Sequence, residues 1–128
     1  MKLLLDTCVF LWILADDKEL SSQAREWIED PENEIFLSSV SVWEIMVKHA
    51  LGRLPLPEQA HSFLSRQRLL HGIESLPLLE EATLQLNRLP EYHKDPFDRM
   101  LICQAIVHGM PFLTPDTAIN RYPVRTMW

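Results

Sequence analysis

His93-Lys94-Asp95-Pro96-Phe97-Asp98-Arg99-Met100-Leu101 combines acids, bases, a proline and large apolar residues within one short stretch. Asp95 suits the N-cap of a helix, Pro96 suits the first helical position, and Asp98 lies where its charge favours the helix dipole. Local physics therefore predicts a helix that begins here and gives both acids a structural role. Whether they do more depends on three other carboxylates at analogous places in the chain: Asp6, Glu44 and Asp116.

The composition is that of one globular domain. With 128 residues the chain can bury a sizeable core, and 47% hydrophobic and 23% charged residues are ordinary values for such a domain. We therefore expect a single domain over residues 1–128. No apolar run approaches the ~20 residues needed to span a bilayer, and the charges at Lys2 and Asp6 come too early for a signal peptide. We expect a cytoplasmic protein with no membrane segment.

The cysteines and the net charge exclude other classes. Cys8 and Cys103 lack the spacing of a zinc site or a disulfide framework, and both lie in apolar segments typical of a core. A formal net charge of −6 argues against a nucleic-acid binder with a broad basic face. The segment 48–71 is nevertheless locally basic, so a basic patch can exist on an acidic molecule.

Strand and helix patterns alternate along the whole chain. Short apolar runs at 2–5, 34–38 and 110–114 are typical of buried strands, with a weaker edge strand at 73–78 and a last one at 122–126. Helical patterns cover 7–15, 20–30, 40–51, 58–70, 79–89 and 97–108, with Thr7 as a candidate cap of the first and Ser39 or Ser41 of the third. This alternation predicts an α/β fold with a central parallel sheet of four to five strands between two helical layers.

Four acids fall where such a sheet binds ligands. Asp6 and Asp116 directly follow strands, while Glu44 and Asp98 lie near the first turns of helices. Ligands bind beyond the carboxyl ends of parallel strands, so all four side chains can converge at one edge. For Glu44 an alternative stays open, because Lys48 follows at i+4 and the two residues can form an ordinary surface pair.

A pocket of carboxylates requires protons or a cation. Two like charges at ~4 Å repel by roughly 4 kcal/mol at an effective dielectric constant of ~20. Oxygen ligands favour Mg²⁺ or Mn²⁺, which can promote phosphodiester cleavage. The sequence has neither a Walker A loop nor GxGxxG, so nucleotide-dependent chemistry has no support. His93 could act as a base or bind phosphate, but we expect this loop histidine to be solvated.

Five motifs together resemble the PIN-domain family, and within it the VapC-type toxins of bacterial type II toxin–antitoxin pairs. The resemblance runs essentially from end to end and rests on Leu4–Thr7, Ser41–Ile45, Lys48 with Leu51–Leu54, Asp95–Leu101 and Thr114–Asp116. It implies a three-layer α/β/α fold and a ribonuclease that depends on Mg²⁺ or Mn²⁺. It also implies a homodimer and a cognate antitoxin protein whose tail covers the active site.

The resemblance assigns roles residue by residue. The family's acidic quartet is matched by Asp6, Glu44, Asp98 and Asp116. Asp98 matches the third acid better than Asp95, which resembles a cap or an outer acid. Thr7 and Ser41 resemble polar neighbours of the metal, and Lys48 or Arg99 would steady a phosphate. Cys103 departs from the family's usual small residue without touching the acid positions.

The function expected from the resemblance is a toxin endoribonuclease. Water activated by the metal would hydrolyse RNA phosphodiesters and leave a 5′-phosphate and a 3′-hydroxyl. The alternative is a catalytically inactive PIN-like module that acts by binding a protein partner. A phosphatase of the haloacid-dehalogenase type is disfavoured, because Cys8 stands where that family needs a second acid.

Overall fold

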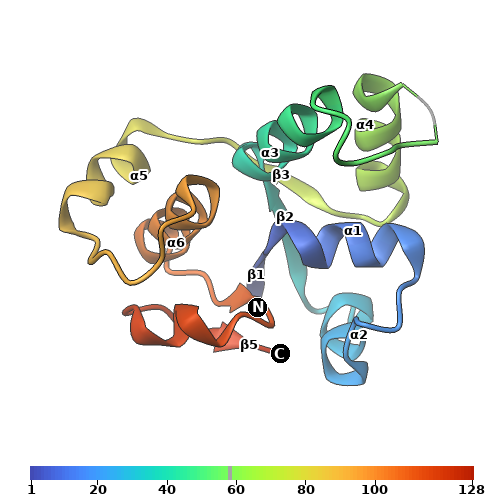
Figure 1. Cartoon of the computed structure of the whole chain (residues 1–128). Coiled ribbons are helices and arrows are strands. Elements are labelled where there is room, and N and C mark those ends of the chain that lie inside the picture. Colours follow the sequence, from blue (N-terminus) through green and yellow to red (C-terminus); the bar gives the residue numbers. More distant parts are fainter. Residues whose placement is uncertain (58) are drawn as a thin grey trace.

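A five-stranded parallel sheet forms the centre of the computed structural model, which describes residues 1–57 and 59–128 (Figure 1). The strand order is β3-β2-β1-β4-β5, so β1 lies in the middle and pairs with both β2 and β4. The strands are β1 (Lys2–Leu5), β2 (Glu34–Ser38), β3 (Glu74–Leu76), β4 (Phe112–Leu113) and β5 (Thr126–Met127). This confirms the predicted parallel sheet and places the weak third strand at an edge.

Helices connect these strands. They are α1 (Thr7–Ala15), α2 (Ser22–Glu29), α3 (Ser39–Ala50), α4 (Ala60–Leu70), α5 (Glu80–Gln85) and α6 (Pro96–His108), with two 3₁₀ helices, η1 (Leu86–Arg88) and η2 (Thr117–Arg121). None of the helices described in residues 1–57 and 59–128 has the length and apolar character to cross a membrane.

Several boundaries differ from the sequence prediction by one or two residues, and three segments need comment. The helix expected over 79–89 divides into α5 and η1, and η1 ends before Leu89, whose extended backbone is the one that a following proline, Pro90, favours. The helix expected to begin at Glu58 is described from Ala60, and Glu58 itself lies outside the described residues. The last strand lies at Thr126–Met127 instead of 122–126. Pro123 in that earlier segment has no N–H to donate to β4.

The helix caps were predicted correctly at α6 and wrongly at α1 and α3. The Asp95 carboxylate accepts the Asp98 N–H at 3.0 Å, as expected of an N-cap. At α3 the cap is Ser38, whose hydroxyl accepts the Val40 N–H at 2.9 Å. At α1 the N-cap position is held by Asp6, with Thr7 already inside the helix and no side-chain capping bond. The Asp6 carboxylate is therefore available for other contacts.

The alternation of side chains along β1 divides the interior into two cores. Leu3 and Leu5 pack with α1, α2 and α4 on one face of the sheet, while Leu4 packs with α6 on the other. All three leucines are fully buried. Cys103 lies in the second core and Cys8 packs at the margin of the first. The three-layer α/β/α architecture is thereby confirmed, and α3 lies at the boundary between the cores.

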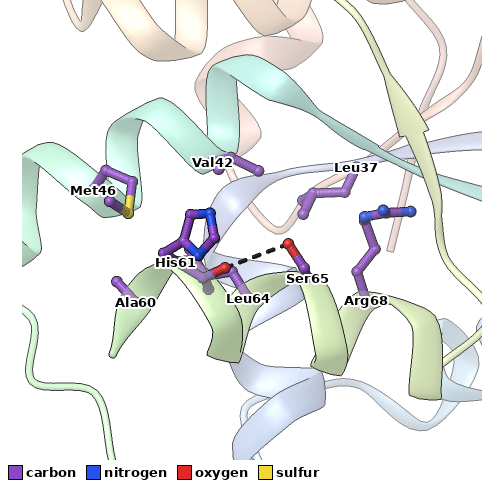
Figure 2. Close-up of a pocket in the computed structure, with 8 residues that line it drawn as sticks. All are labelled: Leu37, Val42, Met46, Ala60, His61, Leu64, Ser65 and Arg68. Atoms are coloured by element: carbon purple, nitrogen blue, oxygen red, sulfur yellow. Dashed lines mark hydrogen bonds between the residues drawn. The ribbon is translucent and has the colours of Figure 1, made fainter. Parts of the chain in front are cut away.

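A groove runs between α3 and α4. Its volume is about 190 Å³, and its floor is formed by Leu37, Val42 and Leu64 (Figure 2). Met46 and Ala60 complete the apolar lining, with the polar side chains of His61, Ser65 and Arg68 along α4. This groove lies on the opposite side of α3 from the acids.

Candidate metal centre

Four acids from four separate segments line one cavity at the carboxyl edge of the sheet. Asp6 follows β1, Glu44 lies in the second turn of α3, Asp98 lies in the first turn of α6, and Asp116 is the N-cap of η2 after β4. The cavity has a volume of about 370 Å³. Asp6 is 6% exposed and Glu44 is 5% exposed, so both carboxylates lie almost entirely out of water.

Burial and nearby negative charges shift the pKa values of two of these acids, Asp6 and Asp98, upward. Burial raises the pKa of Asp6, while hydrogen bonds from the Thr114 hydroxyl and the Thr7 amide oppose the shift. Burial also raises the pKa of Asp98 to about 7, aided by the negative charges of Asp6 and Asp95. Cys8 has a thiol pKa of about 12, because it is buried beside Asp6 and Asp98. The cavity therefore carries a strongly negative potential that a cation would relieve.

Glu44 supplies a direct test of whether these residues fit a metal ion. One carboxylate oxygen, Oε2, accepts a hydrogen bond from Lys48 Nζ at 2.5 Å. The other, Oε1, is buried and has no hydrogen-bond partner among the described residues. Leaving a buried carboxylate oxygen unpaired is costly, and such atoms in native proteins call for an ion or a water. Together with the oxygen-rich donor set, this fits a hard divalent cation such as Mg²⁺ or Mn²⁺.

The alternative of a surface Glu–Lys pair is confirmed for the ion pair itself but not for the exposure of Glu44. Glu44 and Lys48 do form an i,i+4 ion pair, and the Lys48 side chain is 45% exposed. The Glu44 carboxylate points inward and lines the cavity. The hydrogen bond from Lys48 to Glu44 raises the pKa of the lysine, so its charge is retained at the rim of the cavity.

Thr7 and Ser41 lie beside the acids and tie two helices together. The Thr7 hydroxyl donates to Ser41 Oγ at 2.9 Å, and both residues are buried. Only Thr7 of the two lines the cavity as described. This bond joins the first turn of α1 to α3, so it fixes the distance between the segments that carry Asp6 and Glu44.

Of the side chains of Asp95 and Arg99, only that of Asp95 lines the cavity. Asp95 lines the cavity in addition to capping α6. The Arg99 guanidinium donates to the backbone carbonyls of Leu89, Pro90 and His93, at 3.3, 2.8 and 3.3 Å. It does not belong to the described lining of the cavity, and its contacts are those of a clamp on the loop before α6.

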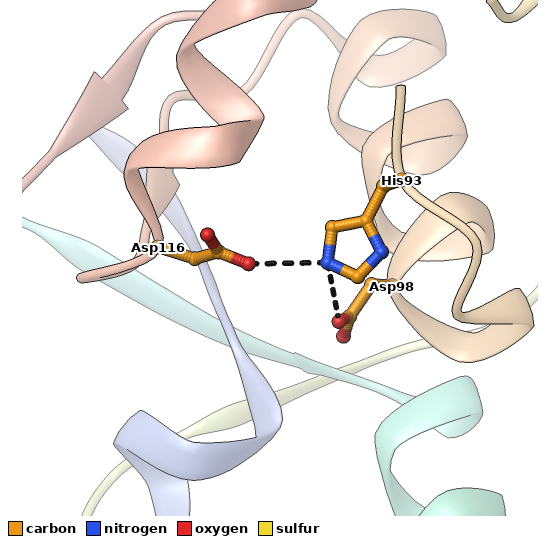
Figure 3. A group of neighbouring side chains, drawn as sticks. All are labelled: His93, Asp98 and Asp116. Atoms are coloured by element: carbon orange, nitrogen blue, oxygen red, sulfur yellow. Dashed lines mark hydrogen bonds and ion pairs between the residues drawn. The ribbon is translucent and has the colours of Figure 1, made fainter. Parts of the chain in front are cut away.

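Sequence reasoning assigned no site role to His93, to Thr114, which donates to Asp6, or to Arg53, which lines the cavity. The expectation of a solvated loop histidine is wrong, because its side chain is 17% exposed and its Nε2 lies 3.1 Å from both Asp98 Oδ2 and Asp116 Oδ2 (Figure 3). The sequence did contain a signal, since a histidine two residues before an N-cap can accept the backbone N–H of that cap residue. Which carboxylates its other nitrogen reaches depends on η2, more than twenty residues further on.

Comparison with known proteins identifies the family. The PIN domain family model matches residues 3–124. Ribonuclease VapC22 of Mycobacterium tuberculosis is 28% identical over 123 residues, which cover 94% of this chain and 92% of that protein. Ribonuclease VapC16 of the same organism is 40% identical over only 43 residues, which cover 34% of this chain and 30% of that relative.

Solved structures show the same fold. VapBC2 from Rickettsia felis, bound to a promoter DNA fragment, aligns with a TM-score of 0.73 at 16% identity and covers 99% of this chain and 98% of that one. DNA-bound VapBC from Salmonella typhimurium aligns with a TM-score of 0.69 at 17% identity, covering 99% and 97%. Since the family model matches residues 3–124, nearly the whole chain, the protein belongs to the PIN domain family.

Proposed function

We propose that the protein is a metal-dependent endoribonuclease and the toxin of a type II toxin–antitoxin pair. The observation that carries this proposal is the convergence of four carboxylates in one cavity, with the buried Glu44 Oε1 left without a partner. Similarity to proteins named ribonucleases, and to structures of VapBC toxin–antitoxin complexes, supports the same reading.

The four acids would hold one or two Mg²⁺ or Mn²⁺ ions, directly or through water. When bound, such an ion supplies activated water and stabilises the charge that develops in phosphodiester hydrolysis. Around it, this chain's own residues hold the carboxylates. Thr114 Oγ1 donates to Asp6 Oδ2 at 2.7 Å, and Lys48 Nζ donates to Glu44 Oε2. Ligating carboxylates are usually oriented by such hydrogen bonds.

The rim of the cavity suits an RNA backbone. Lys48 and Arg53 both line it and bring positive charge beside the acids, whereas the protein as a whole is negative. Lys48 can therefore steady a phosphate while its hydrogen bond to Glu44 is kept. Arg99, the other candidate for this role, is occupied by three backbone carbonyls, which leaves Lys48 as the better candidate.

The likeness to VapBC complexes supports a protein partner, and the family resemblance suggests the rest. We infer a cognate antitoxin protein that blocks the site, a homodimer, and a cytoplasmic location where RNA is accessible. An inactive module that only binds a partner is the competing proposal. The complete set of acids and the unpaired Glu44 oxygen argue against it, because a site without chemistry has no need to keep buried charges together.

The experiment is cleavage of pooled cellular RNA by antitoxin-free protein, with Mg²⁺ or Mn²⁺ and then with EDTA. Wild type should give discrete cuts that need the metal, and Asp6→Asn should abolish them. Asparagine keeps the size of Asp6 and can still accept the Thr114 hydroxyl. Glu29→Gln removes an equal charge from the exposed surface of α2 and should cleave normally. Full activity in Asp6→Asn would refute the assignment, and no cuts by wild type would favour the partner-binding module.

A further inference from the structure

The His93 imidazole stands between two carboxylates that belong to different segments. Its Nε2 lies 3.1 Å from Asp98 Oδ2, in the first turn of α6, and 3.1 Å from Asp116 Oδ2, at the start of η2 (Figure 3). Without a group between them, these two negative side chains would repel each other. Geometry alone allows two readings, in which His93 is either a third ligand of a metal or a donor to two ligands.

The other ring nitrogen decides between these readings. The backbone N–H of Asp95 donates to His93 Nδ1 at 3.1 Å. An N–H group points at a nitrogen only when that nitrogen has a free lone pair, so Nδ1 carries no proton and the proton of the neutral ring is on Nε2. The Nε2–H group is then a donor that faces both carboxylates.

This tautomer is the wrong one for a ligand. A histidine that binds a metal presents a lone pair to it and donates its other N–H to a carboxylate, a carbonyl or a water. If Nε2 were the ligand, the proton would have to sit on Nδ1, directly against the N–H of Asp95. The ring therefore has the opposite hydrogen-bond arrangement from a metal-ligating histidine.

The loop fixes the ring in this orientation. The backbone N–H of His93 donates to the hydroxyl of Tyr122 at 2.7 Å, and its carbonyl accepts from Arg99 at 3.3 Å. Tyr122 is only 4% exposed, so this anchor is part of the second core. With the backbone held at both ends and Nδ1 held by Asp95, turning the ring away would break bonds without replacing them.

We propose that His93 is a positioning residue, which stays outside the metal coordination, donates a hydrogen bond from Nε2 to Asp116 Oδ2 and holds Asp98 Oδ2 in place by its close contact with the same nitrogen. This proposal rests on the proposed metal-dependent function. It completes a pattern in the site, since Asp6 is held by Thr114 and Glu44 by Lys48. His93 adds a hydrogen bond to Asp116 Oδ2 and a 3.1 Å contact to Asp98 Oδ2, so a polar side chain lies against each of the four acids.

The first test is spectroscopic and needs no substrate. In metal-free wild type, ¹⁵N NMR of the histidine rings should place the His93 proton on Nε2. Wild type loaded with Mn²⁺ should give an electron spin-echo spectrum without coupling to a directly bound imidazole nitrogen. A coupling of that kind, or a proton on Nδ1, would overturn the proposal.

The second test is Mn²⁺ affinity, measured by calorimetry on a set of variants. His93→Phe keeps a ring but removes the donor, and it should weaken Mn²⁺ binding by about 10- to 100-fold, as loss of such an orienting partner does elsewhere. His93→Gln can donate from a similar position and should recover most of the affinity. Tyr122→Phe removes a loop anchor while leaving the imidazole intact, and it should change affinity less than His93→Phe does. Unchanged or tighter binding by a folded His93→Phe would overturn the proposal.

These outcomes separate the two proposals. Wild type that binds no Mn²⁺ would overturn both of them. Wild type that binds Mn²⁺ and cleaves RNA, but shows a directly bound histidine nitrogen, would leave the nuclease standing and remove only the role of His93. If His93→Phe fails to fold, the spectroscopic test and His93→Gln still decide, because both keep the ring or its donor.

Discussion

The two sides of α3 face opposite kinds of surroundings. On one side Glu44 and Lys48 line a cavity of about 370 Å³ that holds the four acids. On the other side Val42 and Met46 line the groove of about 190 Å³ against α4 (Figure 2). One face of α3 therefore carries a buried carboxylate, and the opposite face carries apolar side chains.

This difference separates what stabilises the fold from what performs chemistry. The groove side buries apolar surface, which stabilises the folded state by about 25 cal/mol per Å². The cavity side gathers negative charges whose burial raises the pKa values of Asp6 and Asp98, which means that ionising them destabilises the fold. We therefore expect substitutions on the two sides to have opposite effects on stability and separate effects on metal binding.

Leu64→Ala should give the largest change in stability. Leu64 lies on α4, is 4% exposed and belongs to the first core. Truncating such a leucine costs about 2–5 kcal/mol, because it removes buried methyl groups and leaves a cavity. Urea unfolding would measure the loss, and the stabilisation by Mn²⁺ should be unchanged. A change in that metal response would show that the two sides of α3 are coupled.

Metal binding should give the next largest effect. An ion that binds only the folded state stabilises it by ~2.7 kcal/mol at 100 times its dissociation constant. Mn²⁺ should therefore raise the melting temperature of wild type and of the surface control Glu29→Gln, but much less that of Asp98→Asn. Equal shifts in all three proteins would mean that the acids do not form a shared metal site.

Asp98→Asn should stabilise the metal-free protein at pH 8, and this is the smallest effect. The pKa of Asp98 lies at about 7 in the fold against an ordinary 3.8, so wild type loses stability as pH rises between these values. The gap corresponds to ~4 kcal/mol, and we expect about half because the side chain is 21% exposed. Thermal unfolding in EDTA should show the difference at pH 8 and none near pH 4. A destabilised variant at pH 8 would contradict it.

The sequence predicted the sheet and the acid positions for local reasons. Apolar runs such as Lys2–Leu5 and Glu34–Ser38 carry their own strand signal, and Asp95-Pro96 marks a helix start by capping chemistry alone. Contacts between distant segments carried no such signal. The sequence could not show that His93 meets Asp116 or that Tyr122 anchors its backbone, because both contacts form only after α6 and η2 pack against the sheet.

The capping errors have a related cause. Ser38, Ser39 and Ser41 all have a hydroxyl that can cap a helix, and local chemistry does not distinguish them. In the fold Ser38 takes the cap, Ser39 donates to and accepts from the chain near Leu76 and Leu78, and Ser41 accepts from Thr7. Contacts with other segments therefore decide which hydrogen bonds each hydroxyl makes.

The central position of β1 has a consequence for biosynthesis. One edge of β1 pairs with β2, which is made soon afterwards, but its other edge pairs with β4 at Phe112–Leu113. Asp6 is thus made 108 residues before Thr114, and its surroundings stay incomplete until Thr114 and Asp116 have followed. A nascent chain therefore cannot assemble the cavity before the segment after β4 has emerged from the ribosome. A nuclease built in this order would stay inactive until that segment has been translated.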